Sequence, residues 1–114
     1  MSKRDIRLFL FDIKSSVDAI QNYVEGMSYD DFINDRKTYN AVVREFEIIG
    51  EAIKRLPSDL LLKYNEVEWR DIKDFRNLLI HEYFGVDLEI VWNTVCYDVP
   101  LLKQVIEKII TENT

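Results

Sequence analysis

The segment Phe75–Gly85 holds the side chains best suited to chemistry, because it contains Arg76, Tyr83 and His81, the only histidine of the chain. An imidazole can accept or donate a proton near neutral pH. A guanidinium can stabilise a developing negative charge through paired hydrogen bonds. These residue types together indicate acid–base chemistry at an anionic group.

Each of these residues also has a purely structural interpretation. A lone histidine is more often structural than catalytic, and that applies to His81. Arg76 could form a salt bridge with Asp74, with Glu82 or with an acid elsewhere in the fold. Tyr83 could be a core aromatic residue with its hydroxyl at the rim.

The spacing of Arg76 and His81 suggests that two chains are needed to build one catalytic site. On an ideal helix Arg76 and His81 are about 140° apart, so they do not easily point into one pocket of one subunit. A twofold axis between antiparallel helices would bring the arginine of one chain towards the histidine of the other. Two chains also supply two histidines, one for each proton transfer. Because Leu78 and Ile80 add apolar surface beside the Leu79 face, we expect a homodimer.

The elements that carry these residues are helical, because apolar residues recur at intervals of three and four along nearly the whole chain. The pattern predicts an all-α fold, an up-and-down bundle of about four main helices with short helices between them. The expected segments are a helix capped by Ser2 and stopped by Gly26, a short turn over 28–32, a long helix ended by Pro57, a short helix over 58–64, a helix over 69–83, and a helix capped by Asp87 that is kinked at Pro100.

Two residues within these helices suggest how they pack. Gly50 lies inside the second long helix, where glycine costs about 1 kcal/mol relative to alanine. Close approach of another helix or chain would explain it, as would drift on an exposed face, and the apolar surroundings over 48–52 favour close packing. Glu51 by itself is typical of a solvated helix residue. Cys96, next to Val95, is expected to be a buried apolar thiol.

Length and composition limit the classes of protein to consider. The 114 residues, with 47% hydrophobic residues, 3 glycines and 2 prolines, predict a single folded domain over 1–114 and exclude disordered and collagen-like classes. One cysteine and one histidine favour neither a disulfide nor a metal site, and no cofactor is expected. The absence of a long apolar run or signal segment predicts a cytoplasmic protein without membrane contact. The net charge of −6 implies that any contact with nucleic acid is local or assembled from more than one chain.

The motif and its surroundings resemble a known family. Arg76, His81 and Tyr83 match the Arg-x4-His-x-Tyr signature of HEPN ribonucleases, with the polar Asn77 that often follows the arginine. The wider sequence resembles the HepT family over most of the chain, through Ile-Ile-Gly-Glu-Ala at 48–52, the segment 69–87, Val-Trp at 91–92 and Pro-Leu-Leu at 100–102. One departure is that residues 65 and 68 are not the prolines that many relatives carry there, which loosens a loop and leaves the motif untouched.

The resemblance implies a HEPN-like bundle that acts as a metal-independent endoribonuclease toxin of a toxin–antitoxin pair. It assigns catalysis of RNA cleavage to Arg76 and His81, and orientation of the RNA to Asn77 and Tyr83. In that family the antitoxin, MntA, is a minimal nucleotidyltransferase that adds AMP to the motif tyrosine, here Tyr83. The alternative is a non-catalytic helical scaffold that binds such a nucleotidyltransferase. The acidic composition favours the scaffold, whereas the intact motif favours the enzyme.

Overall fold

The computed structural model describes residues 2–82 and 87–113, with the backbone alone for residues 80–82. Within this part of the chain every regular element is helical, which confirms the predicted all-α class. The elements are α1 (Lys3–Tyr23), α2 (Tyr29–Ile33), α3 (Arg36–Arg55), α4 (Ser58–Leu61), α5 (Trp69–Glu82), α6 (Leu88–Asn93), the π-helical turn η2 (Thr94–Asp98) and α7 (Val99–Glu112).

Local capping interactions begin several of these helices. Ser2 and Ser28 each form a complete capping box with the aspartate three residues later, and Asp87 caps α6 by accepting from the backbone N–H of Glu89. Gly26 has a φ of +76° in the turn after α1, a conformation that favours glycine. The predicted helix starts at Ser2, Ser28 and Asp87 are therefore confirmed.

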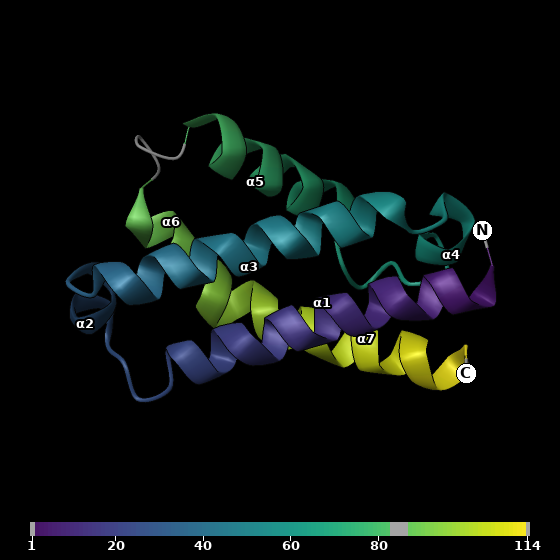
Figure 1. The fold of residues 1–114 in the computed structure, drawn as a ribbon, viewed down its shortest axis with the longest axis horizontal. Helices are drawn as coiled ribbons and strands as arrows, with labels where there is room; N and C mark the ends of the chain where they lie inside the picture. Colours follow the sequence, from purple (N-terminus) through teal and green to yellow (C-terminus); the bar gives the residue numbers. More distant parts are fainter. Residues whose placement is uncertain (1, 83–86, 114) are drawn as a thin grey trace.

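The long helices lie in the order α5, α3, α1 and α7 across the molecule (Figure 1). Helix α1 packs against both α3 and α7, whereas the main neighbour of α5 is α3. The apolar faces of these helices meet in one core, whose fully buried members include Leu10, Ile13, Val17, Ile20, Phe32, Val42, Ile49, Ile53, Leu79, Val91, Ile106 and Ile109. Helix α5 therefore forms an edge of the bundle in one chain.

The C-terminal helices are joined differently from the simple kink at Pro100 that the sequence predicts. The π-helical turn η2 joins α6 to α7, and Pro100 is the second residue of α7, directly after this turn. Val95 and Val99 point into the core here, while the thiol of Cys96 is exposed. The prediction of a buried Cys96 is therefore wrong.

Helix α4 ends at Leu61, earlier than the predicted helix over 58–64. The connection from α4 to α5 is held in place by two hydrogen bonds. The buried Tyr64 donates its hydroxyl proton to Glu112 of α7 across 2.7 Å. The indole Nε1 of Trp69 donates to the backbone oxygen of Tyr64 across 2.9 Å. These two bonds fix where α5 begins. Among the described residues, no helix is both long and apolar enough to cross a membrane.

Candidate active site

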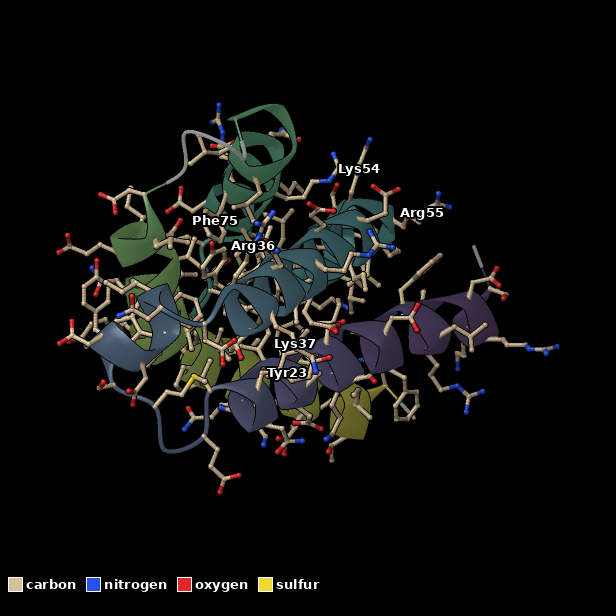
Figure 2. All side chains as sticks on the ribbon, turned by 60° about the vertical axis from the view of Figure 1, so that its left-hand side comes forward. Tyr23, Arg36, Lys37, Lys54, Arg55 and Phe75 are labelled. Atoms are coloured by element: carbon tan, nitrogen blue, oxygen red, sulfur yellow. The ribbon has the colours of Figure 1, made fainter. Side chains whose placement is uncertain are left out.

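Helix α5 carries Arg76, Asn77 and His81, and its apolar face determines how Arg76 and Asn77 are presented. Leu79 is fully buried, and the ring of Phe75 meets that of Phe46 edge to face at a centroid distance of 5.2 Å. Figure 2 shows Phe75 between α5 and α3. Arg76 follows Phe75 by one residue, so it lies at the edge of this apolar face, as the helical projection predicts.

Gly50 is the point of close approach between α3 and α5. A Cβ atom built on Gly50 would overlap the Cβ and Cγ of Arg76 and would lie 3.3 Å from its Cδ. The stem of Arg76 thus occupies the space that any other residue at position 50 would fill. The predicted close packing at Gly50 is confirmed, and the approaching group is the side chain of the motif arginine.

The guanidinium of Arg76 is held at its tip by polar partners. Nη2 donates to Oε2 of Glu51 across 2.8 Å, and Nη1 donates to Oδ1 of Asn77 across 3.2 Å. The other carboxylate oxygen of Glu51 accepts a hydrogen bond of 3.3 Å from Nε of Arg55. The salt bridge considered for Arg76 therefore exists, with an acid of another helix rather than with Asp74.

The side chains of Arg76 and Glu51 are both partly exposed to solvent. The side chain of Arg76 is 23% exposed and that of Glu51 is 41% exposed. The Nε atom of Arg76 is buried and has no hydrogen-bond partner among the described residues. The Arg76–Glu51 pair is therefore neither a fully buried ion pair nor a free surface contact.

A hollow of about 390 Å³ opens beside this pair, between α1, α3 and α5. Phe9, Ile48 and Ala52 supply its apolar lining. The charged residues that line it are three arginines and three acids, namely Arg44, Arg55, Arg76, Asp12, Glu47 and Glu51. Such a hollow can admit a phosphate next to guanidinium groups, although neighbouring carboxylates balance their charge.

The structure brings together some of the predicted site residues. Arg76 and Asn77 are hydrogen-bonded neighbours, and of these two Arg76 lines the hollow. His81 lies on the helical backbone of α5, one turn beyond them, and its side chain is outside the described residues. Tyr83 also lies outside the described residues.

Sequence reasoning missed Glu51 as a member of this group. Taken alone, an acid on a helix is typically solvated, but Gly50 immediately before it marked this turn of α3 as a contact point. A polar residue beside a close-approach glycine could therefore have been identified as a partner for whatever approaches it.

A second hollow, of about 340 Å³, lies between α3, α5 and α7. Its floor is apolar, with Phe46, Ile72 and Phe75 among its members, and acids such as Asp71 and Asp98 line it as well. Neither Arg76 nor Asn77 lines this second hollow, so the predicted contact of Arg76 with a phosphate is not placed there.

Comparison with known proteins shows to which family the chain belongs. The family described as "Ribonuclease HepT-like" matches residues 13–109. The chain is 45% identical over 112 residues to "Putative RNase MJ0125" of Methanocaldococcus jannaschii, covering 98% of this chain and 97% of that relative. It is 41% identical over 107 residues to "Probable ribonuclease HepT" of Thermococcus cleftensis, covering 94% of this chain and 97% of that relative. No solved structure matches the chain significantly. A match of this extent, in a helical bundle whose α5 carries Arg76 and His81 of the motif, shows that the chain belongs to the ribonuclease HepT-like family.

Proposed function

We propose that this chain is a metal-independent endoribonuclease and acts as the toxin of a toxin–antitoxin pair. The observation that carries the proposal is the presentation of Arg76, whose guanidinium is held on α5 at the edge of an open hollow, in a chain of the ribonuclease HepT-like family. A guanidinium fixed in this way can bind a phosphate with its remaining N–H groups.

The proposed reaction is attack of the RNA 2′-oxygen on the adjacent phosphorus. One imidazole takes the proton of the 2′-hydroxyl as the new P–O bond forms. The P–O5′ bond breaks, and a second imidazole, in its protonated form, gives its proton to the leaving 5′-oxygen. Arg76 stabilises the negative charge on the non-bridging oxygens. The products are a 2′,3′-cyclic phosphate and a free 5′-hydroxyl.

Because each chain has one histidine, the two proton transfers need two copies of His81. We infer a twofold dimer in which the α5 helices lie near the axis. The position of α5 at the edge of the bundle supports this arrangement, since its main neighbour in the chain is α3. Leu78 remains half-buried on that helix and would be covered by the partner.

Control of this activity is proposed to act at Tyr83. A nucleotidyltransferase antitoxin of the MntA type would transfer AMP from ATP to the tyrosine hydroxyl, releasing pyrophosphate. The added nucleotide is bulky and negatively charged. If it reaches the hollow lined by Arg76, it would compete with an RNA phosphate for this arginine and block entry, without unfolding the protein.

The direct test compares RNA cleavage by the parent chain, His81→Ala and Arg76→Ala. Both variants should lose cleavage and growth toxicity while they keep the helical circular dichroism spectrum of the parent. A chelator such as EDTA should leave the parental rate unchanged. If His81→Ala cleaves RNA as well as the parent, the enzymatic mechanism is wrong, and the chain is better explained as a scaffold for the nucleotidyltransferase.

A further inference from the structure

Glu51 is the residue that fixes the guanidinium of Arg76, and we propose that it is a positioning residue of the active site. This role rests on the proposed catalytic function of Arg76. It adds a residue from α3 to a site otherwise assigned to a segment of α5. The inference comes from three contacts that converge on one arginine side chain.

The first contact fixes the stem of Arg76. Because position 50 is glycine, the Cβ, Cγ and Cδ atoms of Arg76 lie against the backbone of α3. An arginine side chain has several rotatable bonds, and contact along the stem restricts most of them. The guanidinium therefore reaches α3 at Glu51, the residue after Gly50.

The second contact fixes the tip. The 2.8 Å distance between Nη2 of Arg76 and Oε2 of Glu51 is that of a strong charge-assisted hydrogen bond. The hydrogen bond from Nε of Arg55 to the other carboxylate oxygen, at 3.3 Å, helps orient the carboxylate. Glu51 therefore has one oxygen for each arginine and cannot turn without losing one of them.

The third contact comes from α5 itself, because Asn77 accepts from Nη1 of Arg76 across 3.2 Å. A guanidinium has five N–H donors, and these two bonds use two of them. The Nε–H is buried, so the second hydrogens of Nη1 and Nη2 are the donors left for a phosphate. Glu51 thus sets the direction of the free donors without using all of them.

Glu51 could instead oppose catalysis, because a carboxylate near the guanidinium also repels an incoming phosphate. The two roles predict opposite results when the carboxylate is removed. A positioning residue supports kcat, since it acts on the geometry of the transition state. A competing carboxylate would weaken RNA binding, so its removal would lower KM or raise the rate.

The test uses the full chain and a mixed-sequence single-stranded oligoribonucleotide that carries a fluorophore and a quencher. The variants are Glu51→Ala and Glu51→Gln, which keeps an oxygen acceptor of the same reach. The matched control is Glu45→Ala, because Glu45 is another glutamate of α3 that does not line the hollow and instead accepts a hydrogen bond from Tyr23 of α1 at 3.0 Å. Thermal unfolding of each variant is measured alongside kcat and KM.

We expect Glu51→Ala to lower kcat by about 10- to 100-fold, the effect of misplacing a catalytic group by about 1 Å, while KM changes little. Glu51→Gln should restore most of that loss, and Glu45→Ala should behave like the parent. Unchanged or raised activity in Glu51→Ala, equal losses in both alanine variants, or no rescue by glutamine would each overturn the positioning role.

A double-mutant cycle with Arg76→Lys gives an independent measure if Glu51→Ala proves unstable. Because Glu51 acts through the arginine, Glu51→Asp, whose shorter side chain carries the carboxylate away from the guanidinium, should lower kcat less in the lysine background than in the parent. Equal effects in both backgrounds would contradict the inference. The proposed function fails separately, if Arg76→Ala and His81→Ala keep full cleavage. Loss in those two variants with parental kcat in Glu51→Ala would overturn only the role of Glu51.

Discussion

The stem of Arg76 on α5 lies against the backbone of α3 at Gly50, so the residue proposed to hold the RNA phosphate also forms a close contact between these two helices. The packing of the bundle and the geometry of the candidate site are therefore set at one point. A change at Gly50 should affect both stability and activity, although Gly50 carries no functional group.

Gly50→Ala tests this contact. Alanine gains about 1 kcal/mol of helix propensity, but the new methyl group overlaps Cβ and Cγ of Arg76, and overpacking typically costs about 1–3 kcal/mol. We expect a lower free energy of unfolding by chemical denaturation and slower RNA cleavage. Ser15→Ala, at an exposed position of α1, controls for propensity. A variant at position 50 that is as stable as the parent would show that α5 does not pack on α3 in this way.

The oligomeric state should depend on the outer side of α5. The parent chain is expected to be a dimer at micromolar concentration, and Leu78→Glu should be a monomer, since it places a charge in the proposed apolar contact. Light scattering coupled to size-exclusion chromatography measures both. Leu62→Glu is the control, because Leu62 is 72% exposed and lies outside α5. A monomeric parent would refute the composite site.

Modification should occur at Tyr83. When the chain is incubated with an MntA-type nucleotidyltransferase and ATP, peptide mass spectrometry should place the mass of AMP on Tyr83, and cleavage activity should fall. Tyr83→Phe lacks the acceptor oxygen and should remain unmodified and active in the presence of the antitoxin. Tyr97→Phe is the control, because Tyr97 is 76% exposed and is an alternative acceptor. AMP found on Tyr97 with Tyr83 unmodified would refute the assignment.

The contact between α1 and α7 should make stability depend on pH. Asp18 forms ion pairs with Lys14 at 2.8 Å and with Lys103 at 3.2 Å. The hydrogen bond from Lys14 is the main cause that lowers the pKa of Asp18 below its ordinary value of 3.8, and Lys103 adds to it. A lowered pKa in the folded state means that the carboxylate stabilises the fold above this ordinary value. That stabilisation is lost as the pH falls through the lower folded pKa.

Asp18→Asn should therefore lower the free energy of unfolding at neutral pH by about 0.5–1 kcal/mol, a value limited by the partial exposure of the pair. The difference from the parent should shrink as the pH falls below 3.8. Urea denaturation over a pH series measures it. Asp12→Asn, at an exposed position of the same helix, should show a smaller difference. If the difference in the free energy of unfolding between parent and variant grows as the pH falls, the pKa of Asp18 is not lowered in the folded protein.

The helices and their apolar faces follow from the amino-acid sequence alone. Ser2, Ser28 and Asp87 begin helices as predicted, because a cap depends on a side chain and a backbone N–H two or three residues away. The buried face of α1, including Leu10, Ile13 and Val17, follows from helical periodicity in the same way. The motif segment and the resemblance to the HepT family are likewise visible in the sequence alone.

Which residues meet across helices depends instead on the tertiary packing. Periodicity could not show that the thiol of Cys96 is exposed, because that depends on how η2 joins α6 to α7. Gly50 predicted a close approach, but not that Arg76 makes it, nor that Glu51 receives the guanidinium. Arg76 and Glu51 are 25 positions apart in the chain. Local propensities extend over about one helical turn, whereas the pairing of these residues depends on how α5 packs across α3.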